Sequence, residues 1–137
     1  MSLTVLLVDH SPVMLAGLRK MLAPHSDINV IGSVSTLLEA LTANDELLPD
    51  VTVLDLSLAD RSDQSLTQAR ILALRSKKMV SLTLFSDSET EHIADLLGIT
   101  SRIDKMHMWE SLPNSIRNGG APKADPKKNG IETFRQK

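Results

Sequence analysis

Short aliphatic runs that alternate with helical patterns constrain the fold of this chain more than any other feature. Each run is nearly continuous in Leu, Ile and Val, which is typical of a strand buried on both faces of a parallel sheet. The runs lie at residues 3–8, 28–34, 51–56 and 79–85, with a weaker and more polar fifth run at 101–104. Because right-handed crossovers place helices on both faces of such a sheet, the alternation predicts a doubly wound α/β fold with five parallel strands.

Capping signals indicate where the intervening helices begin and end. Two helices are expected to start at the capping boxes Thr36-x-x-Glu39 and Ser88-x-x-Glu91. The second of these meets Gly98, a natural C-terminal cap, after only about two and a half turns. The other helices are expected near residues 12–23, 63–75 and 109–117, the last with Pro113 inside it.

Composition narrows the class of protein and of site. At 137 residues the chain is long enough for one domain and too short for two of ordinary size. It has no cysteine, which excludes disulfides, thiolate metal sites and a cysteine nucleophile. No apolar run approaches the roughly 20 residues that span a bilayer, and no basic segment precedes an apolar one at the N-terminus. We therefore expect a soluble, cytoplasmic domain that does not bind membranes.

The C-terminal residues differ in character from the rest. Residues 119–137 carry five basic and two acidic side chains, a net charge of +3, whereas the remainder of the chain carries −5. The segment is rich in Lys, Gly, Pro and Asn and lacks periodic apolar residues. We expect residues 1–117 to form the domain and residues 118–137 to be a flexible tail or truncated linker. The total charge of −2 gives no reason to expect direct nucleic-acid binding by the domain.

Polar side chains follow four of the strands at the point where each strand ends. They are Asp9, Asp55, Ser86 and Lys105. Ligands of doubly wound sheets bind at the carboxyl ends of the strands, and in this fold the first, third, fourth and fifth strands lie side by side. Two carboxylates can hold a hard divalent cation, a lysine can bind a phosphoryl oxygen and a hydroxyl can donate a hydrogen bond. The pattern predicts a phosphoryl-transfer site at one crevice.

Four short motifs carry a resemblance to a known family. They are Val8-Asp9-His10-Ser11-Pro12, Val53-Leu54-Asp55-Leu56-Ser57, Leu84-Phe85-Ser86 and Ile103-Asp104-Lys105. Taken in order, they resemble the receiver domains of bacterial response regulators, especially receivers joined to nitrate-response-type helix-turn-helix outputs. The resemblance covers roughly residues 3–117 and implies a flavodoxin-like sheet with strand order 2-1-3-4-5.

The resemblance also implies a role for each residue of the crevice. Asp55 would be the phosphoacceptor that takes a phosphoryl group from the phosphohistidine of a sensor histidine kinase. Asp9, Asp55 and the backbone carbonyl of Ser57 would hold Mg²⁺. Lys105 would bind the phosphoryl oxygen, and Ser86 would turn towards it and so change the surface that an output domain or partner protein reads. These roles balance the charges of the site, because the negative phosphoryl group and two carboxylates need a metal ion and an ammonium nearby.

The sequence departs from the family pattern at several positions. His10 stands where the family usually has its second acid, and we expect weak Mg²⁺ binding because Mg²⁺ prefers oxygen to imidazole. Asp87 adds negative charge at the mouth of the site, where it could obstruct the phosphoryl group or replace the missing ligand. The span from Ser86 to Lys105 is about one helical turn shorter than usual, and Arg102 stands where a switch aromatic is common. If the chain forms a homodimer, we expect it to avoid this altered face.

Three functions remain in competition at this point. The first is a phosphorylatable receiver, and the second is a pseudo-receiver that keeps the fold and binds partner proteins without phosphate. The third, a Mg²⁺-dependent phosphatase, is disfavoured because Asp55-Leu56-Ser57 lacks a second acid two residues after the nucleophile. A flavin-binding role is disfavoured because the loop after the first strand has no Gly- and Thr-rich phosphate-binding sequence. We therefore expect a signalling module rather than an enzyme, although Asp9 and Asp55 could also simply end their strands through turn hydrogen bonds.

The tail provides a first test. Because Ile131 and Phe134 are nearly the only large apolar residues in it, removing residues 119–137 is expected to leave the melting temperature almost unchanged. Thermal unfolding of the full and shortened chains followed by circular dichroism measures this. A loss of several degrees would show that Ile131 or Phe134 packs on the domain.

Overall fold

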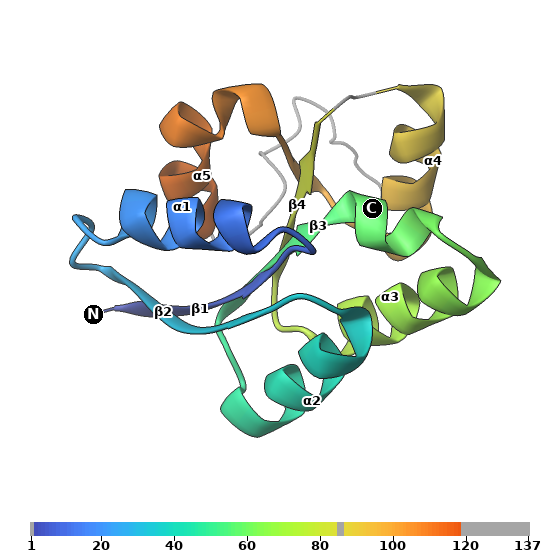
Figure 1. The fold of residues 1–137 in the computed structure, drawn as a ribbon, viewed down its shortest axis with the longest axis horizontal. Coiled ribbons are helices and arrows are strands. Elements are labelled where there is room, and N and C mark those ends of the chain that lie inside the picture. Colours follow the sequence, from blue (N-terminus) through green and yellow to red (C-terminus); the bar gives the residue numbers. More distant parts are fainter. Residues whose placement is uncertain (1, 85–86, 119–137) are drawn as a thin grey trace, which may run out of the picture.

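The computed structural model describes residues 2–84 and 87–118, which form one five-stranded parallel sheet flanked by helices (Figure 1). The strands are β1 (Leu3–Val8), β2 (Ile28–Val34), β3 (Val51–Asp55), β4 (Met79–Thr83) and β5 (Ser101–Asp104). Their order in the sheet is β2-β1-β3-β4-β5, which confirms the predicted doubly wound topology. The α-helices are α1 (Pro12–Leu22), α2 (Leu37–Leu47), α3 (Asp63–Arg75), α4 (Ser88–Leu97) and α5 (Met108–Arg117). Two 3₁₀ helices, η1 (Leu56–Asp60) and η2 (Lys105–His107), follow β3 and β5.

The helices divide into two layers, one on each face of the sheet (Figure 1). α1 and α5 pack on one face, where Leu18, Leu22, Leu112 and Ile116 join the buried side chains of the central strands. α2, α3 and α4 cover the other face in a second apolar cluster. Alternate residues of a strand point to opposite faces, so the central strands must be apolar at nearly every position. This requirement explains their continuous aliphatic sequence.

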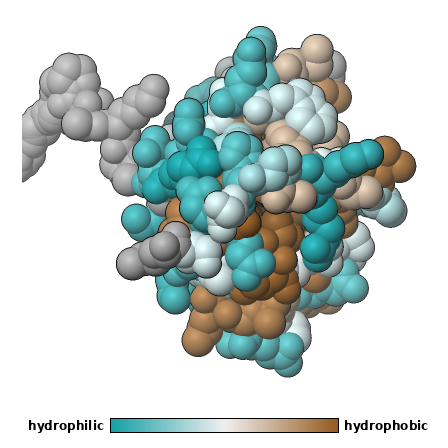
Figure 2. Space-filling view, turned by 90° about the vertical axis from the view of Figure 1, so that its left-hand side faces the viewer, coloured by the Kyte–Doolittle hydropathy of each residue, from teal (hydrophilic) through white to brown (hydrophobic). Residues whose placement is uncertain are grey.

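The outer strand β2 is protected by an irregularity in its pairing. Val5 pairs with Val30 but Leu6 pairs with Gly32, so Ile31 is an extra residue in β2. Such a bulge bends an edge strand and discourages pairing with the edge of another chain. Figure 2 views the side of the molecule that carries this edge and shows hydrophobic residues in its middle and lower parts, flanked by hydrophilic ones.

Several element ends differ from the sequence-based expectations. β3 ends at Asp55, because Leu56 begins η1, and β4 ends at Thr83. The predicted strand residue Phe85 lies outside the described residues. α2 continues to Leu47, three residues beyond the end near Asn44 that the sequence predicts, and ends where Leu48 adopts a left-handed backbone conformation (φ 49°). α5 contains Pro113, as expected, and the residue is buried.

The cap of α4 also differs from the prediction. Asp87, not Ser88, is the N-cap, and its carboxylate accepts a hydrogen bond from the backbone N–H of Thr90 at 2.9 Å. The Thr90 hydroxyl accepts in return from the backbone N–H of Asp87 at 3.0 Å. The helix therefore begins with a capping box one residue earlier than predicted. Gly98 ends it in a left-handed conformation (φ 71°), as expected.

None of the helices in the two described ranges combines the length and the apolar character needed to cross a membrane.

Asp50 joins the start of β3 to β1, a tie that the sequence did not reveal. Its carboxylate accepts hydrogen bonds from the backbone N–H and the hydroxyl of Thr4, at 2.8 and 3.0 Å. The backbone N–H of Asp50 donates in turn to the Thr4 hydroxyl and carbonyl. These bonds hold the pKa of Asp50 below its ordinary value, so the ionised form is favoured in the folded state.

This tie generates a stability prediction. Asp50→Ala is expected to lower the free energy of unfolding by about 1 kcal/mol at neutral pH, because Thr4 loses a charged acceptor. Asp50→Asn, which keeps one acceptor oxygen, should cost less. Since the folded-state pKa is lowered, the contribution of the carboxylate is full above the ordinary value of 3.8 and is lost as the pH falls through the folded value. Urea unfolding of the three proteins between pH 3 and 7 measures this, and an Asp50→Ala difference that is constant over this range would contradict it.

Candidate functional site

The sheet register brings two carboxylates together at the ends of neighbouring strands. Val8 of β1 pairs with Leu54 of β3, so the residues that follow, Asp9 and Asp55, lie side by side. Both are almost completely buried, with 0% and 2% of their surface exposed. Two ionised carboxylates in a buried place repel each other unless cations or hydrogen-bond donors lie nearby. The site therefore depends on what surrounds these two groups.

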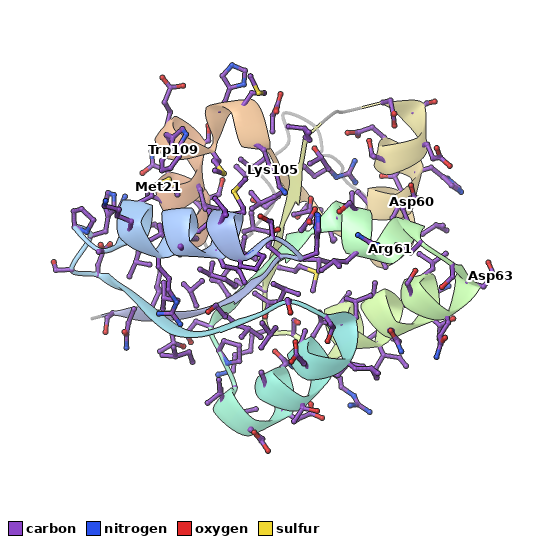
Figure 3. All side chains as sticks on the ribbon, in the orientation of Figure 1. Met21, Asp60, Arg61, Asp63, Lys105 and Trp109 are labelled. Atoms are coloured by element: carbon purple, nitrogen blue, oxygen red, sulfur yellow. The ribbon has the colours of Figure 1, made fainter. Side chains whose placement is uncertain are left out.

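Lys105 supplies a positive charge between the two carboxylates. The side chain reaches from η2, just after β5, towards the ends of the central strands (Figure 3). Its ammonium Nζ lies 3.0 Å from Asp9 Oδ2 and 3.5 Å from Asp55 Oδ1, and only 10% of the side chain is exposed. This short double contact joins β5 to β1 and β3.

His10 lies on the solvent side of the same two groups. Its Nδ1 is 2.9 Å from Asp55 Oδ2 and 3.8 Å from Asp9 Oδ1, while half of the side chain is exposed. The ring therefore faces the carboxylates instead of pointing away from the crevice. With one ring nitrogen against Asp55, His10 occupies part of the space in which a cation or a phosphoryl group would contact the carboxylates.

Ser57 adds hydrogen bonds that the sequence did not indicate. Its backbone N–H donates to Asp55 Oδ1 at 3.1 Å, and its hydroxyl lies 3.0 Å from each carboxylate oxygen. An Asp at a strand end with a Ser two residues later is a common turn pattern, and this pattern was the available signal. Burial raises the pKa of Asp55, but the hydrogen bond with His10, the charge of Lys105 and the bonds from Ser57 together hold it below its ordinary value. Asp55 is therefore an ionised carboxylate at neutral pH.

A cavity of about 350 Å³ opens over this group. Its lining includes His10, Asp55, Thr83 and Lys105, and also Asp87 at the rim. The Asp87 carboxylate is bound to Thr90 as the cap of α4, and these bonds lower its pKa. Among the described residues, Asp87 does not belong to the group of side chains that could hold a metal ion. The predicted switch residue, Ser86, lies outside the described residues.

Three of the predicted residues form a group that could hold a metal ion. One ligand atom each from Asp9, His10 and Asp55 lie within 4.8 Å of one another. Carboxylate oxygens suit Mg²⁺. The backbone carbonyl of Ser57, which was predicted as a further ligand, belongs to η1 directly after Asp55. The imidazole suits Mg²⁺ less well, since Mg²⁺ favours oxygen ligands. The residues thus fit a divalent cation, with one nitrogen in a donor set that is otherwise oxygen.

Arg102 forms the main polar contact between β5 and α4. Its Nη1 and Nη2 lie 2.7 Å from Glu91 and 2.6 Å from Asp95, and its Nε donates to the carbonyl of Ile99 at 2.8 Å. The hydrogen bond and charge of Asp95, followed by those of Glu91, raise the pKa of Arg102. The residue at the expected switch position is thus bound to the exposed acidic face of α4. Acidic residues four apart on that helix were the signal for this pairing.

A small cavity of about 110 Å³ lies beside Arg102, between α4 and the ends of β4 and β5. Ser81 lines it, and the Ser81 hydroxyl is buried without a hydrogen-bond partner among the described residues. A space of this size with an unpartnered hydroxyl can hold ordered water.

Comparison with known proteins finds sequence relatives among bacterial regulatory proteins. No family model matches the sequence. The transcriptional regulatory protein YhcZ of Bacillus subtilis is 32% identical over 85 residues, which cover 62% of this chain and 40% of YhcZ. The response regulator VraR of Staphylococcus aureus is 28% identical over 117 residues, which cover 85% of this chain and 56% of VraR. The chain thus spans about half the length of these relatives.

A solved structure extends the comparison to the fold. The receiver domain of NarL from Mycobacterium tuberculosis superposes with a TM-score of 0.71 at 18% identity, covering 87% of this chain and 96% of that domain. At this low identity the superposition supports only the fold, and the evidence for the family comes from the sequence relatives. Together they support a response-regulator receiver domain.

Proposed function

We propose that this receiver accepts a phosphoryl group on Asp55 from the phosphohistidine of a sensor histidine kinase and conveys the change to an output domain or partner protein. The observation that carries the proposal is the state of Asp55. Its carboxylate lines a cavity and lies 3.5 Å from the ammonium of Lys105, and its contacts with His10, Lys105 and Ser57 outweigh burial and hold its pKa below the ordinary value. An ionised carboxylate with a cation beside it is suited to attack phosphorus, because the cation also stabilises the charge of the product.

The transfer step balances without an additional reactant. An oxygen of Asp55 forms a bond to phosphorus while the bond between phosphorus and the kinase imidazole breaks. The ring, protonated at its other nitrogen, takes the electron pair and leaves as neutral imidazole. Lys105 lies within reach of the phosphoryl oxygens once they enter the cavity, and the Ser57 hydroxyl can donate to the acyl phosphate. A divalent cation, held by Asp9, Asp55 and the Ser57 carbonyl, would neutralise the remaining negative charge. Ser86 is the hydroxyl that we expect to turn towards the phosphoryl group.

The output of the switch is proposed to run through Lys105 and the α4 face. A phosphoryl group on Asp55 would attract the ammonium that now contacts Asp9 at 3.0 Å. Lys105 directly follows β5, and β5 carries Arg102, which is bound to α4. A shift of β5 would therefore be transmitted to α4 through this ion-pair contact. In the family pattern, a rotation of the switch aromatic side chain would do this instead.

The relatives guide the cellular setting of the proposal. YhcZ is named a transcriptional regulatory protein and VraR a response regulator, and the chain covers only part of each. We propose that this receiver acts in the cytoplasm in two-component control of transcription, through an output domain or partner protein and without itself contacting nucleic acid. If Asp55 does not accept phosphate, the second function, a phosphate-independent module for partner proteins, takes its place.

Phosphorylation of Asp55 is directly testable. Acetyl phosphate with a divalent cation is expected to add one phosphoryl group to the protein, detected by intact mass spectrometry and mapped to Asp55. Asp55→Asn should abolish the addition, because the amide is a poor nucleophile. Asp63→Asn, which changes an exposed carboxylate at the start of α3, is the matched control and should be labelled as the wild type is. No addition in either Mg²⁺ or Mn²⁺, or addition that survives Asp55→Asn, would refute the proposal.

Replacement of Lys105 tests the charge balance of the site. Lys105→Met should reduce labelling at least about tenfold, because one partner of the developing charge is lost. It should also lower the free energy of unfolding by about 3 kcal/mol at neutral pH, since two buried carboxylates lose their shared cation. The control is Lys78→Met, which alters an exposed lysine just before β4 and should change neither quantity. Labelling rates and urea unfolding provide the two measurements, and normal labelling of Lys105→Met would contradict the assigned role.

A further inference from the structure

The pocket presents one nitrogen ligand among its carboxylates, and this nitrogen bears on which cation it selects. His10 Nδ1 lies 2.9 Å from Asp55 Oδ2 and 3.8 Å from Asp9 Oδ1. Both carboxylates are buried and fixed by hydrogen bonds from Ser11 or Ser57. Three donor atoms from two rigid strand ends therefore converge on a single point beside the cavity.

The spacing of these atoms matches the bite of a metal ion. A cation that binds imidazole nitrogen and carboxylate oxygen at about 2.0–2.2 Å holds adjacent donors roughly 3 Å apart. The pair formed by His10 and Asp55 already has this separation, at 2.9 Å. The Asp9 oxygen lies 3.8 Å from His10 Nδ1 and would have to move closer, and all three donor atoms lie within 4.8 Å of one another. The ion would take the place of the direct contact between His10 and Asp55.

The far side of the imidazole ring is free to keep its own proton. His10 also lines a second cavity of about 370 Å³, together with Thr36 and Arg61, and half of its side chain is exposed. The ring nitrogen that does not face Asp55 can therefore remain protonated and hydrogen-bond to water. This is the arrangement required of a neutral imidazole ligand.

Lys105 competes with any incoming cation for the carboxylates of Asp9 and Asp55, and this competition increases the selectivity against Mg²⁺. Its ammonium already lies 3.0 Å from Asp9 and 3.5 Å from Asp55, so an incoming cation has to displace part of an existing ion pair. Mg²⁺ gives up water reluctantly and gains little from a nitrogen ligand. Cations such as Co²⁺, Ni²⁺ and Zn²⁺ form strong bonds to imidazole, which offset this competition.

We propose that Asp9, His10 and Asp55 form a mixed nitrogen–oxygen site that selects an imidazole-binding transition cation over Mg²⁺. The inference rests on the proposed function in one respect, since the cation in this pocket is the one that would assist phosphorylation of Asp55. His10 is the residue that determines the selectivity. The ligand class is a divalent first-row transition ion, with Co²⁺ as the probe.

The experiment measures how His10 changes the ratio of two affinities. Most protein sites bind Co²⁺ more tightly than Mg²⁺, so the ratio in the wild type alone is not diagnostic. Mg²⁺ and Co²⁺ are titrated calorimetrically into the full-length wild type and into His10→Asp. His10→Asp should bind Mg²⁺ about tenfold more tightly and Co²⁺ about tenfold more weakly than the wild type, because an oxygen replaces the nitrogen.

A matched variant and a spectroscopic signature keep the result specific. His107 Nδ1 lies 3.7 Å from Asp104 Oδ2 in the other close histidine–aspartate pair among the described residues, so His107→Asp should leave both affinities unchanged. Proton NMR of the Co²⁺-bound wild type should show one strongly shifted, exchangeable imidazole signal that is absent from His10→Asp. Circular dichroism verifies that His10→Asp is folded.

Several outcomes would overturn the inference. They are unchanged Co²⁺ affinity in His10→Asp, weaker Mg²⁺ binding in that variant, loss of Co²⁺ binding in His107→Asp, or no binding of either cation by the wild type. Failure of the proposed function is a separate result. If acetyl phosphate labels Asp55 but the ratio of the Co²⁺ and Mg²⁺ affinities does not depend on His10, the proposed function stands and the proposed selectivity is refuted. Co²⁺ binding as expected with no labelling in any cation retains the selectivity and refutes the function.

Discussion

The contact of Lys105 with Asp9 and Asp55 is the interaction on which the rest of the site depends. Adjacent parallel strands end at one edge of the sheet, so an Asp after each of them places two buried carboxylates side by side. Such a pair is unstable without a cation, and the ammonium, 3.0 and 3.5 Å away, provides one. The same contact ties β5 to the centre of the sheet. The ion-pair network that balances the charge of the pocket therefore also joins three strands of the sheet.

Much of the fold could be predicted because it depends on periodic patterns. Strands buried on both faces need continuous aliphatic sequence, and this requirement located the first four strands. The fifth, Ser101–Asp104, is more polar and was expected from the alternation of strands and helices. Element ends were less predictable, because they depend on individual hydrogen bonds. Asp87 caps α4 through Thr90, although Ser88 with Glu91 offered an equally good sequence pattern. Asp50 resembled an ordinary turn residue, since its partner, Thr4, lies 46 residues away.

The candidate site divides in the same way. The family pattern singled out Asp9, Asp55 and Lys105, and in the structure Lys105 contacts both carboxylates. The direction in which His10 points, and the bonds that Ser57 and Arg102 make, depend on side-chain geometry that no linear pattern records. Arg102 is instructive, because an apolar switch residue is replaced by a charge that binds two acids of the short α4. The shortened helix and the arginine form one compensated change, in which an ion-pair contact joins helix to strand.

The geometry also distinguishes the two carboxylates of the pocket. Asp9 accepts from the backbone N–H of Ser11 through one oxygen and from Lys105 through the other, and it does not line the cavity. Asp55 does line the cavity, and the closest group to its Oδ2 besides Ser57 is the half-exposed and movable His10. Under the proposed function, a phosphoryl donor would approach Asp55 from the cavity beside His10, whereas Asp9 does not line that cavity. Access from the cavity, rather than charge, therefore distinguishes Asp55 from Asp9 as the proposed nucleophile.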